Sequence, residues 1–123
     1  MTVRRFVVPA VVAADGTGTF YSPYLSGNIE AIQYVKTDYA NGVDFTITAE
    51  TTTETIWTES DVNAAVIKHP RAATHSTAGV AALYAGGGTA VNSKVVLSRD
   101  RVKIVIAQGG TSTTGSFTIT VSD

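Results

Sequence analysis

The chain has 123 residues, of which 44% are hydrophobic and 15% charged, with a net charge of −1 at pH 7 and no cysteine. A chain of this length can bury roughly two-thirds of its unfolded surface, so one domain can form a core without metals or disulfides. The balanced charge gives no basic excess for phosphate binding, and the absence of cysteine excludes disulfides and thiolate nucleophiles. We therefore expect a single domain that does not bind nucleic acid.

An apolar run at residues 6–14 follows Arg4 and Arg5, an arrangement that can resemble a signal peptide. The run is short and Pro9 interrupts it, so we interpret it as a β-strand that lies at a sheet edge. No other stretch approaches the roughly 20 apolar residues that a membrane-spanning helix needs. We therefore expect no membrane partner.

Alternating apolar and polar residues predict β-strands along most of the chain. Residues 43–50 and 116–122 alternate strictly, which places their apolar side chains on one face of a sheet. Residues 102–107 are partly apolar on both faces, which predicts a strand deep in a sheet, paired in a hairpin with 116–122 nearer an edge. We expect strands at residues 2–14, 19–24, 28–37, 43–50, 54–59, 64–68, 91–97, 102–107 and 116–122.

Glycine, proline, asparagine and small hydroxyl residues separate these strands, as is typical of turns. The least strand-like part is residues 72–88, which follow His69-Pro70-Arg71 and end in Gly86-Gly87-Gly88. We interpret residues 69–88 as an irregular excursion with room for one helical turn. We expect turns or loops at residues 15–18, 25–27, 38–42, 51–53, 60–63 and 98–100.

Short strands at intervals of about ten residues predict an all-β fold. We expect a single-domain antiparallel β-sandwich of about eight short strands, of jelly-roll or immunoglobulin-like type, or a related barrel. The domain would span residues 1–123, with the irregular excursion at about residues 69–88.

The residues that usually carry chemistry do not form a recognisable constellation. His69 and His75 lie six residues apart without acidic neighbours, which is typical of loop histidines rather than of a metal site. A triad could be assembled from Ser76, His75 and Asp61, but no nucleophile elbow surrounds the serine. We therefore expect neither a metal site nor a nucleophilic centre.

Three glutamates, Glu50, Glu54 and Glu59, could supply the carboxylate pair of a glycosidase. Glu50 and Glu54 flank a threonine-rich turn, where their simpler role is to keep the end of a hairpin in water. Gly86-Gly87-Gly88 lacks the lysine and hydroxyl residue of a phosphate loop, and we interpret it as a linker. The sequence thus predicts no enzyme, no catalytic residue and no cofactor.

A carbohydrate- or surface-binding module is the alternative. Trp57 lies next to Ile56 in an expected strand, so we expect one of the two side chains to face outward. An exposed indole together with tyrosines could stack on sugar rings, although core packing or subunit contact is commoner for such residues. The tyrosines are Tyr21, Tyr24, Tyr34, Tyr39 and Tyr84.

Three phrases of the chain resemble small β-rich virion proteins of tailed bacteriophages, over roughly residues 43–121. They are HPRAATHSTAGVAALYAGGG at 69–88, VNSKVVLSRDRVKIVIAQGG at 91–110 and GSFTITV at 115–121. The resemblance implies a capsid decoration (cement) or head-to-tail accessory protein that acts by contact alone. It also implies a location in the virion after synthesis in the host bacterial cytoplasm.

That resemblance implies the major capsid protein or other virion proteins as partners, with copies that form a homo-oligomer or are templated by the capsid lattice. We expect the excursion at 69–88 and the first strand to form the contact surface, with the sandwich as rigid support. Candidate interface residues are Arg71, His75, Tyr84 and Trp57.

Overall fold

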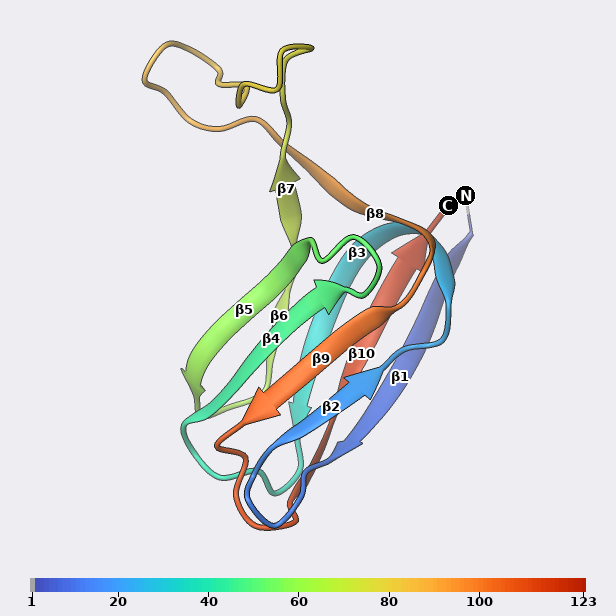
Figure 1. Cartoon of the computed structure of the whole chain (residues 1–123), viewed down its shortest axis with the longest axis vertical. Coiled ribbons are helices and arrows are strands. Elements are labelled where there is room, and N and C mark those ends of the chain that lie inside the picture. The colour runs from blue at the N-terminus through green and yellow to red at the C-terminus, as the bar shows by residue number, and fades with distance from the viewer. Residues whose placement is uncertain (1) are drawn as a thin grey trace.

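The computed structural model describes residues 2–123 as two antiparallel sheets packed face to face (Figure 1). These residues form ten strands and no helix, so the predicted all-β sandwich is confirmed, with two strands more than the expected eight. The strands are β1 (Val3–Val11), β2 (Gly18–Tyr21), β3 (Leu25–Lys36), β4 (Val43–Ala49), β5 (Thr55–Val62), β6 (Val66–Lys68), β7 (Arg71–Ala73), β8 (Asn92–Asp100), β9 (Val102–Ala107) and β10 (Thr114–Ser122).

One sheet has six strands and the other four. The six-stranded sheet has the order β1-β10-β3-β8-β7, with β6 also paired to β3, and the four-stranded sheet has the order β2-β9-β4-β5. All pairings are antiparallel. Apolar side chains from the two inner faces meet between the sheets, as in other sandwiches.

The hairpin predicted from residues 102–107 and 116–122 is wrong. β9 lies inside the four-stranded sheet, whereas β10 lies in the six-stranded sheet between β1 and β3. The intervening loop therefore crosses from one sheet to the other. The alternation in β10 correctly predicts that one face of this strand is buried. It does not predict which strands pair with β10 or whether β10 lies at the edge of the sheet.

The turns predicted at residues 25–27 and 98–100 are also wrong, because these residues belong to β3 and β8. The two strands pair there with a shifted register, and Gly27 lies at the shift with φ 131°. A Cβ on Gly27 would lie 3.2 Å from the carbonyl carbon of Ser122. Glycine is thus needed for a bulge and a close backbone approach, not for a turn.

β5 departs from strict alternation. Trp57 pairs with Ile47, and Thr55 with the next residue of β4, which leaves Ile56 unpaired in a bulge. Ile56 and Trp57 are therefore both buried, and the expectation that one faces outward is wrong. β5 also continues to Val62 through the loop expected at 60–63.

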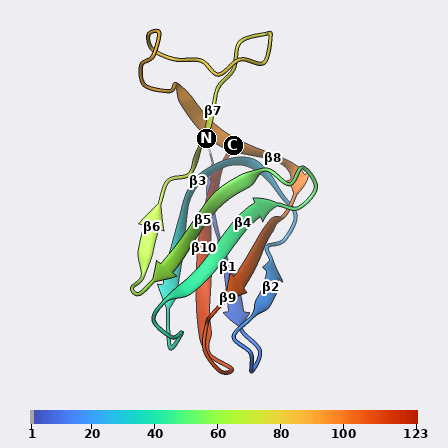
Figure 2. The same cartoon turned by 60° about the vertical axis from the view of Figure 1, so that its left-hand side comes forward.

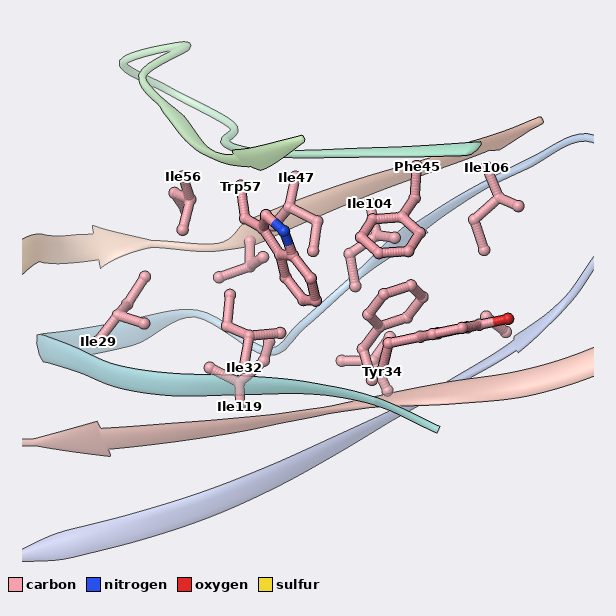
Figure 3. Close-up of a cluster of buried hydrophobic side chains, with 14 of the residues drawn as sticks. Ile29, Ile32, Tyr34, Phe45, Ile47, Ile56, Trp57, Ile104, Ile106 and Ile119 are labelled. Carbon is pink, nitrogen blue, oxygen red and sulfur yellow. The ribbon is translucent and has the colours of Figure 1, made fainter. Parts of the chain in front are cut away.

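The core is centred on aromatic rings from both sheets (Figure 3). The ring of Phe45 lies 4.8 Å from that of Trp57 and 5.2 Å from those of Tyr34 and Phe117, mostly in tilted or edge-on geometry. Such arrangements suit the charge distribution of aromatic rings. Isoleucines from both sheets surround them, namely Ile29, Ile32, Ile47, Ile104, Ile106 and Ile119.

Two buried tyrosine hydroxyls differ in their hydrogen bonding. The Tyr39 hydroxyl donates a hydrogen bond to the backbone oxygen of Ala10, which ties the 38–42 turn to β1. The Tyr34 hydroxyl is buried without a partner. Burial raises the pKa of Tyr34 to about 12 and raises the pKa of Tyr39 as well.

The free edge of β1 is blunted by Pro9. Asp123 donates to the oxygen of Thr2, and Val12 donates to the oxygen of Thr113, so even-numbered residues of this segment bond toward β10. By alternation, the nitrogen of Pro9 lies on the free edge, where it removes a donor that another strand could use. The interpretation of this segment as an edge strand is confirmed.

β7 and the beginning of β8 leave the sandwich at one end and carry a segment that projects from it (Figures 1 and 2). We call residues 71–94 the arm. None of these residues is buried. The expected excursion at 69–88 falls mostly in this arm, where the backbone forms tight hairpins instead of the helical turn that we allowed for.

Candidate contact surface

The base of the arm is held by Glu30, which lies unpaired at a register shift between β3 and β10. Lys94 Nζ lies 2.5 Å from Glu30 Oε1, and this hydrogen bond lowers the pKa of the carboxyl group. The backbone oxygen of Glu30 accepts from Arg71 Nη1 at 3.3 Å and lies 3.2 Å from His69 Nδ1. One bulge residue thus fixes both strands at the point where the arm leaves the sheet.

Beyond the stem formed by β7 and β8, three segments of the arm meet in a ring of backbone hydrogen bonds. Thr74 donates to Val91 at 2.9 Å, Val91 to Ala82 at 3.0 Å and Ala82 to Thr74 at 2.9 Å. Two loops, at residues 76–80 and 84–89, spread from this ring to opposite sides of the stem (Figures 1 and 2). The two loops at the end of the arm are therefore held together by backbone hydrogen bonds within the arm.

Between Arg71 and Lys94 at its base, the arm carries no charged residue although it projects into solvent. No Asp, Glu, Lys or Arg occurs in residues 72–93. Val80 is 65% exposed and Tyr84 77%, and Leu83 is exposed beside them. Exposed apolar side chains on an uncharged segment are typical of a protein contact site.

That uncharged run is visible in the sequence, but the sequence prediction did not use it. Periodicity and glycine content were the signals weighed for residues 72–88, and both describe only the backbone. The absence of charge over residues 72–93 is an additional signal in favour of the contact surface expected at residues 69–88.

Of the four predicted interface residues, Arg71, His75 and Tyr84 lie on the arm. Trp57 does not, which corrects its assignment as an exposed contact residue. Its side chain is only 8% exposed, and its indole Nε1 donates to Glu59 Oε1 at 3.0 Å. The bulge at Ile56 turns the indole into the core, where it contacts Phe45 edge-on.

The aromatic residues do not form a common sugar-binding platform. Tyr34 and Tyr39 lie in the core with Trp57. Tyr21 and Tyr24 lie instead beside Arg101, whose guanidinium carbon is 4.0 and 5.3 Å from their ring centroids. These two rings stabilise a cation by cation–π contact. The carbohydrate-binding alternative therefore loses the exposed indole on which it depended.

The possible triad is not assembled. Asp61 lies near the end of β5, at the end of the sandwich away from the arm that carries His75 and Ser76 (Figure 1). The hydroxyl of Ser76 accepts backbone hydrogen bonds from Ala78 and Val80, both at 3.3 Å. This serine closes a turn, a common role for small hydroxyl residues.

Two of the three glutamates considered for glycoside hydrolysis, Glu50 and Glu59, have separate partners. Glu50 Oε2 accepts from Arg101 Nε at 2.7 Å, and Glu59 accepts from Trp57. Within residues 2–123, no group of three or more His, Cys, Asp or Glu is placed to hold a metal, and no pocket is found. The same residues form no helix of the length and apolarity that membrane crossing requires.

Neither the protein-family models nor the curated proteins compared with this sequence gave a match. The most distinctive feature of the structure is an arm without charged residues between positions 72 and 93, fixed at Glu30, on a well-packed sandwich.

Proposed function

We propose that this chain is a non-enzymatic structural protein of a tailed-phage virion that decorates or cements the capsid surface through protein–protein contacts. The observation that carries the proposal is the exposed, uncharged arm. A head-to-tail accessory role would use the same kind of contact. Its partners would be the major capsid protein, other virion proteins or neighbouring copies of the chain.

The arm supports a contact role because three of its large apolar residues remain exposed in the monomer. Val80, Leu83 and Tyr84 expose apolar surface that a partner would remove from water, at about 25 cal/mol per Å². No charged side chain would lose its hydration when residues 72–93 are covered. The arm is thus suited to contact with another protein surface.

The sandwich supports the same proposal as a rigid base. Its core joins both sheets through Phe45, Trp57 and the surrounding isoleucines, and the Glu30 contacts fix the direction in which the arm projects. An arm that is already ordered before binding loses less conformational entropy on binding than a disordered arm would. The resemblance of residues 69–88, 91–110 and 115–121 to phage virion proteins favours a capsid or neck surface as the place of contact.

The test is to purify particles from bacterial cells that produce the phage and measure the copies of this chain per capsid protein by quantitative mass spectrometry. We expect a fixed ratio for the wild-type chain. We expect a lower ratio for Tyr84→Ala and loss of the chain when Asn-Gly replaces residues 74–91. Tyr24→Ala is the matched control, because Tyr24 is an exposed tyrosine outside the arm.

Absence of the wild-type chain from purified particles would contradict the proposal. Equal incorporation of the arm-deleted chain would show that another surface makes the attachment. Far-UV circular dichroism of each variant is the control for folding. Loss of the β-sheet signal on deletion of the arm would mean that the arm is needed for the sandwich to fold.

A further inference from the structure

A second uncharged surface lies on the outer face of the six-stranded sheet. Cross-strand pairing places Val7, Thr118, Gln33 and Ile67 in one row across β1, β10, β3 and β6. The neighbouring row holds Pro9, Ser116 and Val35, followed by Val11 on β1. We call the outward side chains of Val7, Val11, Gln33, Val35, Ile67 and Thr118 the valine face.

Three apolar residues of the valine face are exposed. Val7, Val11 and Ile67 are 57%, 58% and 53% exposed. No charged residue lies in these rows. Arg5, which pairs with Thr120 in the next row toward the arm, is charged. The outer face of the four-stranded sheet differs, since Lys103 lies among its outward residues.

The two uncharged surfaces cannot cover each other within one molecule. The valine face occupies the half of the sheet distant from the arm, where β1 ends and β6 pairs with β3 (Figures 1 and 2). The Glu30 contacts with Lys94 and Arg71 direct the arm away from this half. A contact between the surfaces therefore requires two copies.

We propose that the arm of one copy binds the valine face of a second copy. The inference rests on the proposed contact role of the arm and names its partner. Both surfaces are apolar and uncharged, so their association buries no unpaired charge. The contact joins different surfaces of the two copies. Repeated contacts therefore build a closed ring if the rotation between neighbouring copies closes, and an open filament if it does not.

The size of the valine face predicts how strong this contact is. Strand spacing and residue rise give a patch about 20 Å by 20 Å, or about 400 Å² per copy. That is roughly half of the area per partner in a stable complex, so one contact alone is weak and reversible. Ring closure or attachment to a lattice would strengthen it by holding several contacts together.

Sedimentation velocity of the purified chain tests the proposal, over protein concentrations from about 1 μM to about 1 mM, where weak contacts form. We expect the wild-type chain to self-associate as its concentration rises. Leu83→Glu on the arm and Val7→Glu on the valine face should each leave the chain monomeric. Val105→Glu is the matched control, because Val105 is an exposed valine on the outer face of the other sheet, and it should associate like wild type.

An equimolar mixture of the two monomeric variants gives the sharper result. Val7→Glu keeps an intact arm and Leu83→Glu keeps an intact valine face, so one productive contact remains between them. We expect the mixture to form a dimer of one copy of each and to stop there. Arm-to-arm or face-to-face association would instead leave one of the variants able to associate alone.

Three results would overturn the proposal: a wild-type chain that stays monomeric throughout, either variant associating like wild type, or a mixture that remains monomeric. If Val7→Glu fails to fold by circular dichroism, Ile67→Glu on the three-residue edge strand β6 replaces it. A chain that associates in solution but is absent from virions contradicts only the proposed function. One that is monomeric in solution but present in virions contradicts only the contact between copies.

Discussion

The sandwich and the arm use apolar residues in opposite ways. In the sandwich, Phe45 is buried among rings from both sheets, whereas in the arm Tyr84 is 77% exposed. The sandwich is held by contacts between residues distant in sequence, and the arm by backbone hydrogen bonds between near neighbours. One part of the chain thus buries its aromatic residues, while the other leaves its aromatic residue in contact with water.

Truncation of one aromatic residue in each region should give the largest difference in stability. We expect Phe45→Ala to lower the free energy of unfolding by about 4 kcal/mol, because it leaves a cavity between Tyr34, Trp57 and Phe117. Tyr84→Ala should change it by less than about 0.5 kcal/mol. Urea denaturation followed by far-UV circular dichroism measures both, and similar losses would mean that the arm contributes to the core.

A second comparison adds one methyl group to a glycine in each region. A Cβ on Gly115 would contact the ring of Tyr39, 2.8 Å from Cδ2, and would lie 2.9 Å from the oxygen of Val35. We expect Gly115→Ala to destabilise the fold by about 3 kcal/mol through overpacking. Gly86 has open space around it, so Gly86→Ala should change unfolding by about 0.5 kcal/mol or less. Thermal denaturation that ranks the two variants in the reverse order would contradict the assigned packing.

The dependence of stability on pH in base tests the burial of Tyr34. Tyrosine ionises near pH 10 in the unfolded chain, and burial raises the pKa of Tyr34 to about 12. The folded state resists ionisation, so this contribution to stability is complete below about pH 10 and is lost as the pH rises toward 12. Tyr34→Phe should make the free energy of unfolding fall less steeply between about pH 10 and 11, by about 1.4 kcal/mol per pH unit at most.

At neutral pH the same two tyrosines should behave differently. Tyr39→Phe should destabilise the fold by about 1 kcal/mol, because the Tyr39 hydroxyl donates to Ala10. Tyr34→Phe removes a hydroxyl that has no partner and should not destabilise. Equal losses in urea denaturation would indicate that the Tyr34 hydroxyl is hydrogen-bonded in solution.

The smallest effect is expected at the junction of the two regions. Glu30→Gln removes the ion pair with Lys94 but keeps the backbone oxygen that accepts from Arg71. We expect no measurable change in global unfolding, since partly exposed ion pairs contribute little. Amide hydrogen exchange of Thr74, which bonds to Val91, should become faster while exchange in β10 stays unchanged. Unchanged exchange at Thr74 would show that the stem alone holds the arm.

Much of the sandwich could be predicted from the alternation of residue types. Residues 43–50 and 116–122 form strands as expected, because one polar and one apolar face is enough to define a half-buried strand. The pairing of β9 with β4 rather than β10 could not be predicted, because alternation identifies a face and not a neighbour. The burial of Trp57 was missed because one unpaired residue, Ile56, reverses the alternation on its C-terminal side.

The arm was predicted only in outline. The break at His69-Pro70-Arg71 and the glycines at 86–88 marked a segment outside the regular strands. Its direction depends on Glu30, which is distant in sequence and meets Lys94 only after β3 and β8 pair. Such a contact has no local signature in the sequence.

The position of β10 between β1 and β3 has a consequence for the order of folding. Val3 pairs with Ser122, so β1 has no partner in its sheet until the last strand is made, and β3 lacks a neighbour on the same side. Pairing of such distant segments is slow compared with the closing of the arm's local hairpins, which takes microseconds. The valine face spans β1, β10 and β3, so it would form only after β10 has been synthesised. During synthesis, a copy could therefore present its arm before it could accept the arm of another.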